Sequence, residues 1–181
     1  VNEINFQVGG LTADSLWYQG LVDQVAVFKG SLTAEQVDSL YNDEYDRLVQ
    51  PNYPAKQLVQ FEFNEGAGTE VSSVDGQFSG SFVYNVNWAD EGIDGMSLSF
   101  PDSGYIDTDF PGVLGKRQLS VAAWIKSDSL NKPFLWWGKE DRLTKMELKI
   151  DKTGIFRAQI FGNAVLGTTN VADGQWHHVV C

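Results

Sequence analysis

One carboxylate in this sequence sits where apolar side chains are expected. Asp23 lies in the segment GLVDQVAVF, and in an extended chain its side chain shares a face with Leu21, Val25 and Val27. A carboxylate among apolar neighbours must accept hydrogen bonds, pair with a cation or bind a metal ion, because burial without a partner is costly. Asp23 is therefore the most informative polar residue of the chain.

The six tryptophans raise the question of carbohydrate binding, because the C–H faces of sugars stack on exposed aromatic rings. Trp17 and Trp88 lie in loop-like surroundings, and we expect them at a binding rim. Trp136 and Trp137 are adjacent, so on a strand they face opposite ways and one of them is expected to be exposed. A strand covered on both faces is the alternative. The predicted ligand-binding residues are Trp17, Tyr18, Trp88, Trp136 and Trp137, with Tyr84 as a further candidate.

No arrangement of residues predicts catalysis. Glycoside hydrolysis needs two carboxylates on one face, and the nearest set, Glu140, Asp141 and Glu147, has the wrong period for one strand face. Glu62 and Glu65 also fall on opposite faces. Neither a Gly-x-Ser-x-Gly motif nor a Walker-type glycine loop is present. We therefore expect a protein that is not an enzyme.

The composition restricts the partners. A formal net charge of −11 and a pI near 4.4 argue against nucleic acid and anionic membranes. No apolar run approaches the roughly 18–20 residues that span a bilayer, so membrane insertion is not expected. The single cysteine, Cys181, excludes an intramolecular disulfide and a cysteine-based zinc site. His177 and His178 are adjacent without further spaced ligands, so we expect packed or hydrogen-bonded histidines.

Most of the chain alternates apolar and polar residues with period two, which predicts strands separated by Gly-containing turns. The clearest segments are LVQFEF, LSVAAWIK, MELKID, FRAQIF and WHHVV. One helix is predicted over SLTAEQVDSLYNDEYDRLV, with Thr33 as its N-cap and Gln36 completing a capping box. Its predicted apolar stripe consists of Val37, Leu40, Tyr41, Tyr45 and Leu48. The fold class is therefore all-β: a jelly-roll sandwich of two antiparallel sheets with one short helix.

Four segments in order carry a family resemblance: FEFNEGAGTEVSSVDGQFSG, MSLSFPDSGYID, LSVAAWIKSDSL and DGQWHHVV. Together they resemble the opening two-thirds of a laminin-G-like (LamG) domain of the concanavalin A-like lectin/glucanase superfamily. The earlier segments INFQVGG and GLVDQVAVFKGSLTAEQVDSLYN resemble the closing third of the same domain. The resemblance implies a concanavalin A-like jelly roll whose C-terminal third precedes its N-terminal two-thirds.

This order gives a predicted organisation of three segments. Residues 1–50 supply the closing strands and helix, residues 51–57 a linker with Pro51 and Pro54, and residues 58–181 the opening strands. The favoured interpretation is one permuted unit in which the two parts pack together; the alternative is pieces of two tandem copies. The hairpin that follows Trp-His-His-Val in the family is missing, so we expect open sheet edges that invite self-association.

The resemblance also implies a structural Ca²⁺. In related modules the aspartate that matches Asp23 helps to bind this ion, and the local candidates for further ligands are Glu62, Asn64, Glu65 and Asp75. The sequence departs from the family where a loop aspartate is common, because Ser73 stands there and Asp75 is displaced by two residues. The alternative, in which Asp23 caps backbone amides of a neighbouring loop, stays open.

The function implied by the resemblance is non-catalytic recognition or adhesion in a secreted or cell-surface protein. A glycan is the favoured ligand, and a surface protein is the other partner considered. Two alternatives are a structural repeat that contacts neighbouring copies and an accessory domain of a polysaccharide-degrading enzyme. The fold alone does not choose among them.

Overall fold

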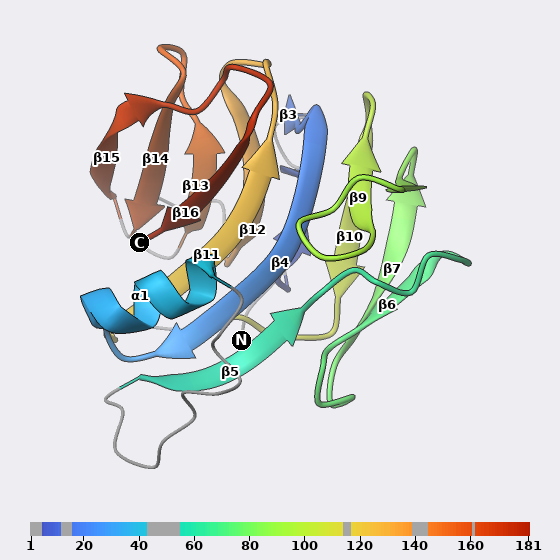
Figure 1. Ribbon diagram of the computed structural model, residues 1–181, viewed down its shortest axis with the longest axis horizontal. Coiled ribbons are helices and arrows are strands. Elements are labelled where there is room, and N and C mark those ends of the chain that lie inside the picture. Colours follow the sequence, from blue (N-terminus) through green and yellow to red (C-terminus); the bar gives the residue numbers. More distant parts are fainter. Residues whose placement is uncertain (1–4, 12–15, 43–54, 114–116, 139–144, 161) are drawn as a thin grey trace.

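The computed structural model describes residues 5–11, 16–42, 55–113, 117–138, 145–160 and 162–181 (Figure 1). The elements are β1 (Gln7–Val8), β2 (Gly10–Leu11), β3 (Leu16–Trp17), β4 (Gly20–Lys29), α1 (Ala34–Tyr41), β5 (Lys56–Phe61), β6 (Glu70–Ser72), β7 (Ser79–Tyr84), β8 (Asn87–Ala89), β9 (Ser97–Phe100), β10 (Gly104–Thr108), β11 (Leu119–Lys126), β12 (Lys132–Trp137), β13 (Met146–Ile150), β14 (Ile155–Ile160), β15 (Asn163–Asn170) and β16 (Trp176–Val180). Within the described residues α1 is the only helix.

The strands form two main antiparallel sheets, which confirms the predicted all-β sandwich. The eight-stranded sheet has the order β15-β14-β13-β12-β1-β10-β7-β6. The six-stranded sheet has the order β16-β11-β4-β9-β8, and β5 also pairs with β4. The short strands β2 and β3 pair only with each other.

An apolar core lies between the two sheets. From the six-stranded sheet, Val121, Ala123 and Ile125 of β11 belong to it, as the alternation of LSVAAWIK predicts. Met146 and Leu148 of β13 belong to the same cluster from the eight-stranded sheet. Each such side chain contributes roughly 1.5–3 kcal/mol by leaving water. The remaining residues of each strand therefore point to the outer faces.

The helix α1 starts as predicted. The Thr33 hydroxyl accepts a hydrogen bond from the Gln36 amide at 3.3 Å, and the Gln36 side-chain oxygen accepts one from the Thr33 amide at 2.9 Å. This is the expected capping box. The helix covers a second apolar cluster on the outer face of the six-stranded sheet, formed by Ala26, Phe28, Ala55 and Ala122 with Leu32, Leu40 and Val180 packed against it.

The predicted apolar stripe of this helix is only partly correct. Leu40 packs against the cluster, whereas Tyr41 is 56% exposed and Gln36 and Ser39 are buried. The difference arises because the capping box draws the Gln36 side chain back to the helix start. Tyr45 and Leu48 lie outside the described residues.

The N-terminal segment supplies central strands to both sheets. β1 pairs with β12 on one side and β10 on the other. β4 lies between β11 on one side and β9 and β5 on the other (Figure 1). The strands of residues 7–29 therefore share one sandwich with those of residues 56–180. β5 begins at Lys56, inside the segment predicted as a linker. Its first residue, Lys56, pairs with Lys29, the last residue of β4.

Candidate functional site

Three aromatic rings meet where β7 ends and β10 begins. The Trp17 ring stacks on Tyr105 with centroids 6.0 Å apart and planes within 14° of parallel. Tyr84 meets Trp17 edge-on at 6.0 Å and Tyr105 edge-on at 6.3 Å. Tyr84 is 74% exposed, and the other two side chains are half-buried. This aromatic cluster (Trp17, Tyr84 and Tyr105) holds its rings in fixed positions and still offers aromatic surface to solvent.

Local backbone geometry brings these rings together. Trp17 lies on β3 directly opposite Gly10 of β2, where a Cβ atom would come within 2.8 Å of the Trp17 ring. Tyr84 closes β7 in a left-handed conformation, with φ at +61°, which costs a non-glycine residue about 1–2 kcal/mol. Tyr84 pairs there with Gly104 of β10, next to Tyr105. Strained residues of this kind are held in place by their surroundings.

A row of polar side chains crosses the outer face of the eight-stranded sheet beside this cluster. Its members pair directly across neighbouring strands: Asp107 of β10, Gln7 of β1, Trp136 of β12, Glu147 of β13 and Gln159 of β14. The residues that follow or precede them, Val8, Ile106, Leu135, Leu148 and Ala158, belong to the core. The polar row therefore faces away from the core. Tyr105 shares its face because it lies two residues before Asp107.

The Glu147 carboxylate of the polar row is paired with two lysines. Glu147 is 3% exposed, and its carboxylate oxygens lie 2.7 Å from the Lys145 Nζ and 2.9 Å from the Lys149 Nζ. Burial raises the pKa of Glu147, but the hydrogen bonds from the two lysines outweigh it and hold the pKa below its ordinary value. Lys145 also lies over the Trp136 ring, 4.9 Å from its centroid.

The centre of the polar row has unused hydrogen-bonding capacity. The Gln7 Nε2 donates to the Asp107 Oδ1 at 3.1 Å, which fixes both side chains. The Gln7 Oε1 and the Trp136 Nε1 are buried and have no hydrogen-bond partner in the described part of the chain. Buried polar atoms of native proteins are almost always paired with protein, water or ligand. Both atoms are buried, so the exposed hydrogen-bonding group of the row is Asp107 at its β10 end.

The row continues along β10 into a shallow hollow. Tyr105, Asp107 and Asp109 point to the same side of the chain, and four residues of a strand span about 13 Å. A hollow of about 250 Å³ opens beside Asp107 and Asp109, between β10 and the start of β7. The Ser79 amide donates to Asp109 at 2.8 Å, which orders this end. An aromatic surface and two carboxylates thus follow one another along residues 105–109, with the hydroxyls of Ser79 and Ser81 beside them on β7.

Of the predicted aromatic ligand residues, Trp17 joins this site and Trp88 does not. Both lie on strands, β3 and β8, and not in loops as the sequence predicted. The Trp88 Nε1 donates to the Gly68 carbonyl at 3.0 Å, and its ring packs on Phe82 at 5.3 Å. These contacts tie Trp88 to the edge of the core.

Three other predicted ligand residues, Tyr18, Trp136 and Trp137, are buried and present no exposed ring; for the two tryptophans this is the alternative of a strand covered on both faces. Tyr18 is 0% exposed, its hydroxyl donates to the Lys126 carbonyl at 3.2 Å, and burial raises its pKa. Trp137 enters the core and donates to the Val113 carbonyl at 3.1 Å. Trp136 points to the outer face, but the Lys145 side chain lies over it and it is 0% exposed. Neighbours distant in sequence cover both faces of this strand.

Asp23 is buried, and it caps backbone amides. One carboxylate oxygen accepts from the Gln24 amide at 2.8 Å and the other from the Ile93 amide at 2.7 Å. Burial raises the pKa of Asp23 to about 7, against the opposing effect of these hydrogen bonds. The carboxylate therefore attaches the loop of residues 90–96 to the six-stranded sheet.

The other predicted calcium ligands are also engaged with nearby groups. The Asn64 Oδ1 accepts from the Met96 amide at 2.9 Å, at the far end of the same loop. Asp75 accepts from the Ser73 hydroxyl at 2.7 Å within its own turn, and Glu62 accepts from Gln60 at 3.3 Å. Among the described residues, no group of three or more His, Cys, Asp or Glu side chains gathers as a metal set. Calcium binding stays a prediction.

The two histidines are packed and hydrogen-bonded, as expected. The His177 Nε2 lies 2.8 Å from an Asp173 carboxylate oxygen. His178 packs against Trp124 and Tyr41, with ring centroids 5.0 and 6.1 Å away, and burial lowers its pKa to about 4. Both histidines therefore have structural contacts.

Comparison with protein-family models, with curated proteins and with solved structures gives no significant match. Within the described residues, no helix is long and apolar enough to cross a bilayer. The LamG resemblance therefore stays a prediction, and the function is argued from the site itself.

Proposed function

We propose that this chain is a non-catalytic carbohydrate-recognition module that binds a glycan along β10. Sugar recognition needs a flat apolar surface for the C–H face of a ring and a few directed polar groups for its hydroxyls. The aromatic cluster supplies the first, and Asp107, held in place by Gln7, supplies the second on the same face. A carbohydrate-recognition module of this kind would act in a secreted or cell-surface protein.

The observation that carries the proposal is the Trp17–Tyr105 stack two residues from Asp107. Stacking fixes the Trp17 ring without covering it completely, so little conformational freedom is lost when a ligand binds. Asp107 is exposed and already oriented by Gln7. The line from Tyr105 to Asp109 is about 13 Å long, which favours an oligosaccharide over a single sugar ring.

The distance between the β10 and β13 carboxylates supports recognition without hydrolysis. Asp107 and Glu147 lie three strands apart, so their backbones are separated by about 14 Å. Glycosidases place their two carboxyl groups about 5–9.5 Å apart. The two lysines on Glu147 also keep it ionised, and an ionised carboxylate cannot donate a proton to a leaving group. The closer pair, Asp107 and Asp109, lies about 7 Å apart on one side of the chain, but Asp109 already accepts hydrogen bonds from the Ser79 amide and hydroxyl.

A glycan array with the purified chain tests this proposal, run with calcium and with a chelator. We expect binding to a defined oligosaccharide class in both conditions, because no predicted calcium ligand belongs to the site. Trp17→Ala should weaken binding about tenfold or more, whereas Tyr41→Ala, which truncates an exposed aromatic side chain elsewhere, should bind like the wild type. Equal binding by wild type and Trp17→Ala would place the ligand elsewhere.

The structural-repeat alternative has one observation in its favour. β15 ends the eight-stranded sheet with an uncharged edge, and Val165 and Leu166 on it are 64% and 55% exposed. Exposed edges of this kind accept a further strand. Sedimentation velocity at rising concentration would show dimers that Val165→Lys abolishes if copies pair through β15; a monomer throughout would remove this alternative.

A further inference from the structure

A hollow lined by cationic and neutral groups opens where β4 ends and β5 and β11 begin. Its volume is about 500 Å³, and its described lining consists of Lys29, Gly30, Lys56, Arg117 and Gln118. We call it the basic pocket. No carboxylate belongs to this described lining, although the chain carries a formal net charge of −11. Positive charge is thus concentrated here against the overall sign of the molecule.

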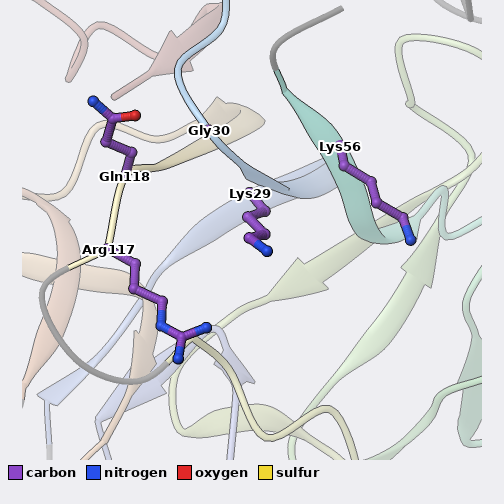
Figure 2. Close-up of a pocket in the computed structure, with 5 residues that line it drawn as sticks. All are labelled: Lys29, Gly30, Lys56, Arg117 and Gln118. Carbon is purple, nitrogen blue, oxygen red and sulfur yellow. The ribbon is translucent and has the colours of Figure 1, made fainter. Parts of the chain in front are cut away.

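Strand register brings the three cations together. Lys29 at the end of β4 pairs directly with Lys56 at the start of β5, and on its other side with Leu119 of β11, two residues after Arg117. Figure 2 shows the Lys29 side chain between those of Arg117 and Lys56. The Gly30 amide, in a backbone conformation with φ at +108°, donates to the Gln118 carbonyl at 3.0 Å and closes the wall behind Lys29.

The arrangement is unfavourable without an anion. Like charges directly opposite each other on neighbouring strands repel and destabilise the pair. The ion pairs between described residues involve Lys126, Lys145, Lys149 and His177, so none reaches the basic pocket. Lys29, Lys56 and Arg117 are all exposed, and their heads are therefore accessible to a ligand from solvent.

We propose that the basic pocket binds a tetrahedral oxyanion, a sulfate or phosphate, either free or as an ester group. The Arg117 guanidinium offers a planar fork that matches two oxygens of such a group, and the two lysines add mobile point charges. The Gln118 side chain points away from Arg117 in Figure 2, so recognition depends on charge and not on the amide. The pocket lies at the end of the six-stranded sheet, whereas the carbohydrate site lies on the outer face of the eight-stranded one.

Amide chemical shifts of the ¹⁵N-labelled chain, titrated with inorganic sulfate and separately with phosphate, test the proposal. We expect saturable shifts at Gly30 and Gln118, and none with chloride at equal ionic strength. Lys29→Gln/Lys56→Gln should raise the apparent Kd about tenfold or more, since two of the three charges are gone. Lys152→Gln, which removes an exposed lysine on the 151–154 turn, should leave it unchanged.

The titration distinguishes a loss of anion binding from a loss of folding. The same spectra show that each variant is folded, and without anion the double variant should unfold at an equal or higher urea concentration than the wild type, because the Lys29–Lys56 repulsion is removed. Shifts that are absent, unsaturable, or unchanged in the double variant would overturn the proposal. A sulfated monosaccharide that binds more tightly than free sulfate would identify an ester group on a larger molecule; weaker binding of the ester would identify the free ion.

Discussion

Replacing Asp23 by Asn should change how the stability of this protein depends on pH. The folded state holds the Asp23 pKa near 7 because burial outweighs two hydrogen bonds from amides, while the unfolded chain titrates near 3.8. A folded pKa above the unfolded one means that the folded state binds the extra proton between these values. The stabilisation is therefore fully present below about pH 3.8 and is lost as the pH rises through 7.

The magnitude follows from this difference. Each pKa unit corresponds to about 1.36 kcal/mol, so Asp23 alone should lower the free energy of unfolding by about 2.5 kcal/mol between pH 5 and pH 8. Asp23→Asn cannot titrate and lacks this slope. The Asn side chain also turns its NH₂ group toward one of the two backbone amides, of Gln24 or Ile93, that donate to Asp23, and this loss of a hydrogen bond costs about 1–3 kcal/mol. Urea unfolding followed by tryptophan fluorescence at both pH values measures the two effects.

The loss of unfolding free energy caused by Asp23→Asn should thus be about 2.5 kcal/mol larger at pH 5 than at pH 8. Parallel pH dependences for the two proteins would refute the raised pKa. A bound calcium ion would hold the carboxylate ionised and remove the slope from the wild type as well. Repeating the series in chelator separates these explanations, and stabilisation of the wild type by added calcium would support the ion at Asp23.

His178 should give a pH dependence opposite to that of Asp23. Its pKa in the folded state, near 4, lies below the usual 6.5, so the wild type loses stability as the pH falls from 6.5 to 4. His178→Phe should remove this dependence. The variant, which keeps a ring against Trp124, should gain about 2–3 kcal/mol relative to wild type between pH 7 and pH 4, and an unchanged difference in urea midpoints would contradict this. Gly20→Ala should cost about 3 kcal/mol or more, because the backbone φ is +144° and the new Cβ would lie 2.2 Å from the Lys126 carbonyl oxygen. Gly68→Ala is its control, with a positive φ but no atom within 4 Å, and equal losses of stability in the two variants would show that the clash is relieved elsewhere.

The strands and the helix start are accessible from sequence because they depend on local rules. Period-two alternation places Val121, Ala123 and Ile125 in the core, and Thr33 with Gln36 fixes where α1 begins.

Asp23 is buried as predicted, but not on the predicted face. The register of β4 shifts at Gln24, which has a positive φ, so Val22 and Val25 both enter the core and Asp23 does not share a face with Val25 and Val27.

The candidate site is different because it is assembled from distant segments. Gln7, Asp107 and Trp136 become neighbours only through the order β10-β1-β12, which no local pattern encodes. Trp136 is buried although it points away from the core, because the Lys145 side chain lies over its ring. The alternation of Tyr105, Asp107 and Asp109 was visible in the sequence, but nothing indicated that Trp17 would stack beside it.

An amide and indole chemical-shift titration of the ¹⁵N-labelled chain with the best glycan from the array would locate the carbohydrate site. We expect saturable shifts centred on the Trp17 indole N–H and the amides of β10, and their loss in Trp17→Ala. Shifts centred instead on Gly30 and Gln118, on the β15 edge, or on the 90–96 loop would contradict a carbohydrate site on β10.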